Sequence, residues 1–458
     1  MLYVFFFLLI VIGALLLRLF FKQEKFSFLK SLALSYFLGW AVVTGQVFIF
    51  LFYLKLTMAN WWLWWFGLEV VVLAVCLFFK DKWVIDEIKA WPTQGLDFLK
   101  RILKFPKVEL LLSCLVLIFI ALTLVNALNQ PLTGWDSVAN WSFKAKSIFE
   151  HQKIIFDPNQ AYFWKDFSYP NYPWQLSVGW AYLGFLIGNF SDMANNLVSF
   201  GFYLGAVILL YDFLLKYTSR RLSLLFAWFL ASSSLFMYHG YAQYGDLPLG
   251  ALALAGFICL FETYRQVDYK KYLLAGIFMG IATLSKNEAI FFVLASLPWL
   301  WLSLKRFDKK LKQKNILFYF IGLASTSLFW WLFKLINNLG VRNTESGFYW
   351  HPEIIPKIFD AWFSFSSFNL FWFGFFLILI MNFKAIKQDR HLFFGYLYLL
   401  LILGQFIFVY IFTQSYTYAL DGTVVSRNIL SFLPIAMILT ALSLKGESAL
   451  LNSDNQHV

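Results

Sequence analysis

Apolar residues fall in long blocks along this chain, and short polar stretches separate one block from the next. A helix needs roughly 20 apolar residues to cross a bilayer, and about thirteen blocks approach or exceed that length. They lie near residues 1–17, 31–54, 61–79, 108–128, 195–215, 222–238, 247–263, 272–285, 289–304, 316–336, 363–381, 393–413 and 428–444. The pattern predicts an all-α polytopic membrane protein with about 13 transmembrane helices.

The composition supports the same fold class. Of the 458 residues, 60% are hydrophobic and 14% are charged, so the apolar surface exceeds what a soluble core could bury. The net charge of +12 comes from Lys and Arg scattered over short loops, which indicates membrane topology rather than binding to nucleic acid. The cysteines lie inside apolar runs and predict neither a disulfide framework nor a thiolate metal site; they are Cys76, Cys114 and Cys259.

Loop charges predict which side of the membrane each loop faces. Lys and Arg crowd into alternate loops, such as residues 80–107 and 305–314, and such loops face the cytoplasm. The loop Asn129–Asn195 then faces outward, with the N-terminus outside and the C-terminus inside. The apolar stretch Trp174–Gly188 is too short for an ordinary span and is interpreted as an interfacial or re-entrant helix. This first large external loop therefore carries two surface helices, Ser137–His151 and Trp174–Gly188.

Two aspartates stand where the chain enters or leaves the membrane on the outer side. Asp136 lies in a Gly-Trp-Asp-Ser turn, where Gly134 allows a tight chain reversal. Asp246 lies two residues before Pro248 at the start of a span. Each has two interpretations: the carboxylate acts in a functional site, or it caps the helix that follows.

A second group combines cations with an amide and an acid. Lys286, Asn287 and Glu288 interrupt two apolar runs, and Arg427 opens the last span on a side where arginine is scarce. The alternatives are a solvated turn for the trio and a snorkelling anchor for the arginine. If these residues form a site, Arg427 and Lys286 would neutralise the phosphate of a substrate whose long apolar tail lies between helices. A nearby carboxylate would take a proton from an incoming hydroxyl or amine.

Four motifs then follow one another in the order of a known family. They read "GWDSVANWSFKAKSIF", "YPNYPWQLSVGWAYLG", "YTSRRLSLLFAWFLASSSLFMYHGYAQYGDLPLGALAL" and "LAGIFMGIATLSKNEAIFFVLA". In this order they resemble the C-class membrane glycosyltransferases with the GT-C fold, close to protein O-mannosyltransferases and lipid A aminoarabinose transferases. The resemblance covers residues 108–300 and, more loosely, Arg427.

The resemblance implies an inverting transfer of a hexosyl or pentosyl group from a polyprenyl-phosphate carrier to a glycan, lipid or protein acceptor on the outer face of the membrane. It gives Asp136 the role of base or acceptor-orienting group and makes Asp246 the second catalytic acid. Arg427 and Lys286 would bind the donor phosphate. The residues expected to contact substrate are Asn287, Glu288, Tyr244 and Lys165. Ser137, rather than a second acid, follows Asp136, so the motif lends no support to a metal-dependent variant; participation of a divalent metal is left open, and no other cofactor is expected.

On this basis the chain divides into four parts. Residues 1–80 form a three-helix N-terminal extension, residues 81–107 a cytoplasmic linker, residues 108–445 the GT-C-like transmembrane module and residues 446–458 a cytoplasmic tail. We expect a multi-pass protein of a bacterial inner membrane with its site facing outward, and membrane lipid as a partner.

Two other functions fit parts of the same pattern. A transporter or flippase of an amphiphilic lipid also needs many spans and outward cations, but such proteins often show inverted halves, whereas here the polar clusters gather at one face. An O-antigen polymerase or ligase would be expected to carry arginine-rich external loops, and external arginines are few in this chain. No P-loop motif occurs, which argues against an ATP-driven pump.

Overall fold

The computed structural model confirms an all-helical chain over the residues that it describes. These are residues 1–21, 26–58, 69, 82–154, 168–264, 268–303, 305, 308–340, 347–363, 365–420 and 422–444. Every regular element within these ranges is a helix. The backbone clusters into two compact units, each described by itself below.

Seven helices in the described ranges are long and apolar enough to cross a membrane. They are Phe28–Phe52, Lys107–Asn129, Asp192–Tyr217, Asp246–Thr263, Lys309–Ile336, Arg390–Phe412 and Val424–Ser443. Shorter apolar helices cover Leu2–Arg18, Gln175–Ile187, Ala289–Leu302 and Phe371–Met381. The chain is thus a multi-pass membrane protein, while the count of 13 spans, the loop layout and the four-part division of the chain stay predictions. Most of the span predicted at residues 61–79, and the tail at 446–458, lie outside the described residues.

The first unit comprises Met1–Leu209, Gly240–Gly245 and Phe329–Leu339. Its described residues contain the first part of α9 (Asp192–Tyr217), the end of α15 (Lys309–Ile336) and seven further helices. Those are α1 (Leu2–Phe20), α2 (Phe28–Phe52), α4 (Lys82–Ile102), α5 (Lys107–Asn129), the π-helix η1 (Ser137–Ser142), α6 (Phe143–His151) and α8 (Gln175–Ile187). Ser27 caps α2, because its hydroxyl accepts a hydrogen bond from the Lys30 amide at 3.0 Å.

Both helices predicted for the first external loop are present in this unit. The predicted helix Ser137–His151 is divided into η1 and α6, and α8 agrees with the predicted Trp174–Gly188. Gly134 has a φ of 91°, a left-handed value that suits glycine, and the chain bends there, just before Asp136. Helices α6 and α8 pack against each other, and most of α8 is buried.

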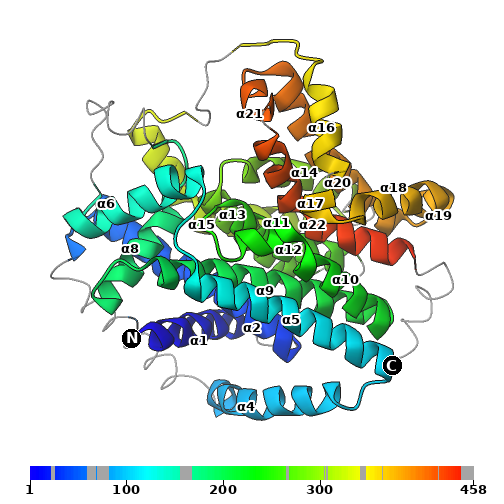
Figure 1. The fold of residues 1–458 in the computed structure, drawn as a ribbon, viewed down its shortest axis with the longest axis horizontal. Coiled ribbons are helices and arrows are strands. Elements are labelled where there is room, and N and C mark those ends of the chain that lie inside the picture. The colour runs from blue at the N-terminus through cyan, green and yellow to red at the C-terminus, as the bar shows by residue number, and fades with distance from the viewer. Residues whose placement is uncertain are drawn as a thin grey trace. The chain divides into compact units, whose positions relative to one another are not determined.

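The second unit comprises Leu210–His239, Asp246–Leu328 and Gly340–Val458. Besides parts of α9 and α15 it contains α10 (Arg220–Ser232), α11 (Ser234–His239), α12 (Asp246–Thr263), α13 (Tyr269–Ser285), α14 (Ala289–Ser303), α16 (Ile354–Phe363), α17 (Phe365–Phe368), α18 (Phe371–Met381), α19 (Phe383–Gln388), α20 (Arg390–Phe412), α21 (Tyr416–Leu420) and α22 (Thr423–Ser443). Helix α12 is buried along its whole length and packs against α13 and α22 (Figure 1).

Two of the predicted spans in this unit are interrupted. The apolar block 222–238 is divided at Ser233, whose backbone is extended and whose hydroxyl donates to the Ser367 carbonyl at 2.8 Å. The block 363–381 is divided after α17, where Asn369 has a φ of 53°. Serine and asparagine bond readily to nearby backbone and tolerate non-helical conformations, so apolar content alone does not keep either helix continuous.

Candidate functional site

Three charged residues of the second unit meet at the ends of its central helices. Asp246 is the first residue of α12, Lys286 follows the last residue of α13, and Glu288 directly precedes α14. Pro248 is the third residue of α12, where its missing amide proton costs no helical hydrogen bond. The packing of α12 against α13 and α14 therefore brings the carboxylate of one loop to the ammonium of the next.

The ammonium of Lys286 bridges the two carboxylates. Its Nζ lies 2.7 Å from Oδ1 of Asp246 and 3.0 Å from Oε1 of Glu288. The exposed fractions of the three side chains are 6%, 1% and 18% for Lys286, Asp246 and Glu288. The solvated-turn interpretation of the Lys-Asn-Glu trio is therefore wrong, since Asn287 is also only 8% exposed. At Asp246, the carboxylate forms an ion pair with the lysine instead of a hydrogen bond that caps α12.

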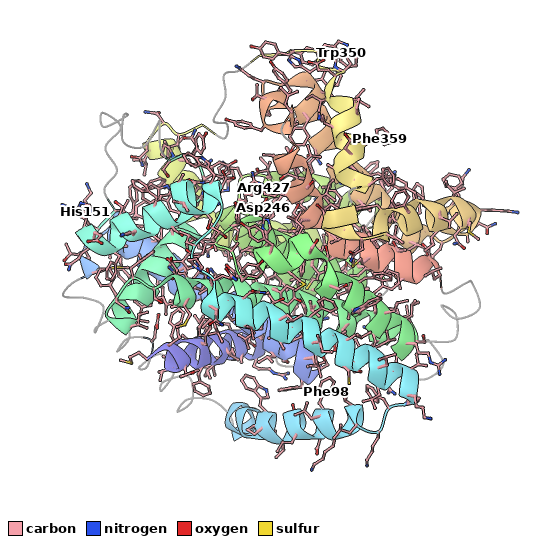
Figure 2. The ribbon with its side chains drawn as sticks, viewed as in Figure 1. Phe98, His151, Asp246, Trp350, Phe359 and Arg427 are labelled. Atoms are coloured by element: carbon pink, nitrogen blue, oxygen red, sulfur yellow. The ribbon has the colours of Figure 1, made fainter. Side chains whose placement is uncertain are left out.

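Arg427 adds a second positive charge to this group. It lies in the first turns of α22, and its charge interacts with Asp246 and with Lys286. Figure 2 labels Arg427 and Asp246. Gly250, one turn after Asp246, allows this approach, because a Cβ at that position would lie 2.9 Å from the carbonyl oxygen of Ser431, one turn after Arg427. We call Asp246, Lys286, Glu288 and Arg427 the charge cluster.

The charges of the cluster balance. Two carboxylates face one ammonium and one guanidinium. Burial lowers the pKa of Lys286, but Asp246 and Glu288 raise it by more, so that pKa lies above its ordinary value. Lys286 is therefore a permanent cation, and an added phosphate would meet a group with two fixed positive charges.

Three further residues surround the cluster and were not predicted from the sequence. His239, the buried last residue of α11, interacts electrostatically with Asp246. The amide of Asn428 donates a hydrogen bond to the hydroxyl of Tyr410, whose ring system lies within electrostatic reach of Lys286 and Glu288. A histidine seven residues before Asp246, in a loop predicted to face outward, is a signal that sequence reasoning could have used, but a tyrosine inside an aromatic-rich span is not.

Asp136 belongs to the first unit. It stands at the N-cap position of η1 but has helical backbone angles, and its side chain makes no capping hydrogen bond. The capping interpretation of this aspartate is therefore wrong for its side chain, and its carboxylate, in a half-buried residue, is not used to begin the helix. Tyr244 is also in this unit and is buried, whereas Lys165 lies outside the described residues. The roles of these residues stay predictions.

The first unit contains a buried lysine that the sequence did not single out. Nζ of Lys144 donates to the carbonyl of Tyr169 at 2.7 Å and lies 5.5 Å and 5.6 Å from the ring centres of Trp141 and Trp174. Burial, together with the charge of Lys334, holds the pKa of Lys144 well below its ordinary value. Among the described residues, a carbonyl and two indole faces thus surround this ammonium.

Within the described ranges, no group of three or more His, Cys, Asp or Glu side chains is arranged to hold a metal ion. Two free cysteines are described, Cys114 and Cys259. The participation of a divalent metal stays open.

Comparison with known proteins identifies the central part of the chain. Residues 176–331 match the family model of dolichyl-phosphate-mannose-protein mannosyltransferase. The match confirms the resemblance to C-class glycosyltransferases, and the chain is a multi-pass membrane protein with a glycosyltransferase-family domain. Asp246, Lys286 and Glu288 lie inside the matched segment, while Asp136 and Arg427 lie outside it. No curated protein and no solved structure matches the chain.

Proposed function

We propose that this protein transfers a sugar from a polyprenyl-phosphate donor to a glycan, lipid or protein acceptor at the outer face of the membrane, with inversion at the anomeric carbon. The observation that carries the proposal is the charge cluster, three of whose members lie within the mannosyltransferase-family segment. Buried charges at the ends of membrane helices are costly to maintain, and they mark functional sites more often than structural ones.

The donor suits the cluster chemically. A polyprenyl phosphate has an anionic head and a long apolar tail, so it combines charge recognition at a membrane surface with burial among helices. Arg427 and Lys286 are the proposed ligands of the phosphate, because Arg427 adds positive charge to an ammonium whose own charge is already matched by carboxylates. The donor class is supported by the matched family, whose model is described by a dolichyl-phosphate-mannose substrate.

The reaction requires a base and a stabilised leaving group. In the proposed step, Asp136 accepts the proton of the acceptor hydroxyl as its oxygen attacks the anomeric carbon. The bond from that carbon to the phosphate oxygen breaks, and the electron pair leaves with the lipid phosphate. Cations at the phosphate stabilise the charge that develops there, so no acid needs to protonate the leaving group.

The outward orientation rests on the loop charges, which favour cytoplasmic positions for the Lys- and Arg-rich loops and outer positions for Asp136 and the charge cluster. A bacterial inner membrane is the proposed location.

The deciding experiment measures sugar transfer from a polyprenyl-phosphate donor in nanodiscs by wild type and by Asp136→Asn. An amide cannot accept the proton, so we expect at least about a 100-fold loss of turnover with unchanged donor binding and thermal stability. The matched control is Asp268→Asn, because Asp268 does cap a helix by accepting from the Lys270 amide at 2.9 Å, and asparagine caps as well as aspartate. Full turnover in Asp136→Asn would remove the base from the proposal, and no transfer by wild type from any polyprenyl-phosphate sugar would refute the proposed function.

A further inference from the structure

A buried amide, Gln243, lies at the centre of a polar network in the first unit. Its side chain is 0% exposed. The amide oxygen accepts a hydrogen bond from the hydroxyl of Ser142, the last residue of η1. The amide nitrogen donates to the backbone oxygen of Asp192 at 3.2 Å and to Oδ1 of Asn196 at 3.0 Å. Because a broken bond here would leave a buried polar atom unpaired, the amide holds its partners in one arrangement.

The same partners hold the chain that leaves α5. Nδ2 of Asn196 donates to the backbone oxygen of Gln130 at 3.1 Å, and the backbone amide of Leu132 donates to Oδ2 of Asp192 at 3.3 Å. Asp192 and Asn196 are one turn apart at the start of α9, so a single helix end bonds both to the amide and to this stretch of backbone. We call Gln130, Leu132, Ser142, Asp192, Asn196 and Gln243 the Gln243 network.

The network therefore fixes the segment 130–142 on both sides of Asp136. Residues 130 and 132 are held before the aspartate, and Ser142 is held after it. Between these points the chain bends at Gly134, whose carbonyl accepts from the Val138 amide at 3.1 Å. A short segment with both ends anchored has little freedom to displace its carboxylate.

Gln243 also lies close in the sequence to the charge cluster. It stands three residues before Asp246, the first residue of α12 and a member of the charge cluster. One short segment thus carries both the amide that anchors the first external loop and the acid that opens the central helix of the second unit.

We propose that Gln243 is a positioning residue, which holds the segment 130–142 so that Asp136 meets the proton of the acceptor. The proposal rests on the glycosyltransferase function and on the base role of Asp136.

The first test is hydrogen exchange of residues 130–142 in nanodiscs, measured by mass spectrometry with α22 as the internal reference. In Gln243→Ala we expect exchange in this segment to rise roughly tenfold or more, since the three hydrogen bonds of a buried amide are lost, and exchange in α22 to stay unchanged. Ser142→Ala should show part of the effect, and Ser142→Thr, which keeps the hydroxyl, should restore protection. The control is Ser223→Ala, which removes another fully buried serine hydroxyl on α10.

The second test separates positioning from general stability. Gln243→Ala should lower kcat for sugar transfer by roughly 10- to 100-fold, the order expected for a misplaced catalytic group, and leave KM for the donor unchanged. In the Asp136→Asn background the same substitution should cause no further loss, because the group it positions is already inactive. A role in folding alone would lower turnover equally in both backgrounds.

Each arm can overturn the proposal. Unchanged exchange of residues 130–142 in Gln243→Ala would show that the amide does not hold the segment, and equal losses in both backgrounds would show that it does not act through Asp136. If wild type transfers no sugar, the proposed function and the positioning role fail together, while the exchange result still decides whether the network anchors the loop.

Discussion

Removing Lys286 tests the charge cluster most directly. In Lys286→Met the methionine fills similar space, but Asp246 and Glu288 lose the ammonium at 2.7 Å and 3.0 Å while their side chains are only 1% and 18% exposed. Breaking a buried ion pair by deleting one partner typically costs about 3–5 kcal/mol, since the remaining charge is left uncompensated. We expect the free energy of unfolding to fall by that amount.

A second substitution should restore part of the stability that Lys286→Met loses. In Lys286→Met two carboxylates share one guanidinium, and adding Asp246→Asn removes the excess negative charge, so the double variant should be more stable than Lys286→Met alone. Asp246→Asn by itself should cost less, about 1–3 kcal/mol, because Lys286 keeps Glu288 as a partner. The coupling energy of the cycle should therefore exceed about 1.5 kcal/mol.

The assay is SDS-induced unfolding of the purified protein in mixed micelles, followed by tryptophan fluorescence. The matched control is Lys216→Met, which breaks an ion pair with Glu262 at 3.3 Å in which the lysine side chain is 58% exposed; such a pair contributes about 0–1 kcal/mol. A loss in Lys286→Met no larger than in this control, or a double variant less stable than the single one, would refute the buried-pair reasoning.

Three further outcomes are expected. Arg427→Ala should weaken binding of a polyprenyl-phosphate donor by about 1.5–3 kcal/mol, roughly 10- to 150-fold in Kd, whereas Arg220→Ala, at an exposed site on α10, should leave it unchanged; equal Kd values would reduce Arg427 to an anchor. The pKa of Lys144 is lowered, so the unfolded chain binds the extra proton and stability should rise with pH from the lowered value up to 10.5; Lys144→Met should lose this rise, and identical pH profiles of unfolding would contradict the shift. In a cysteine-free background, Trp135→Cys, at a position 73% exposed, should react with an impermeant maleimide in intact cells and Lys310→Cys only after permeabilisation; the reverse pattern would invert the topology.

The helical fold was predictable because apolar blocks of spanning length leave few alternatives in a bilayer. The interruptions of the predicted spans 222–238 and 363–381 were not predictable, since Ser233 and Asn369 are single polar residues whose effect depends on neighbouring backbone groups. A π-helix after Asp136 likewise has no signal in hydrophobic periodicity.

The sequence pointed to the members of the charge cluster one by one but not to their arrangement, and their roles stay predictions. Charge in an apolar chain singled out Asp246, Lys286, Glu288 and Arg427, because unpaired charge near hydrocarbon needs a reason. One lysine bridges both acids because α12 packs against α13 and α14. No local sequence pattern encodes this packing. Gln243 escaped notice for a related reason: an uncharged amide beside a span looks like any loop residue until its partners are known.

The order of the cluster's members along the chain bears on how the protein is made. Helices α12, α13 and α14 reach the membrane well before α22, so for an interval during synthesis two carboxylates share a single ammonium and the guanidinium is still absent. Net charge at a helix end inside a bilayer is unfavourable, and the arrival of α22 removes it. We therefore expect the second unit to reach its full stability only once α22 has packed against α12 and brought the guanidinium of Arg427 to Asp246.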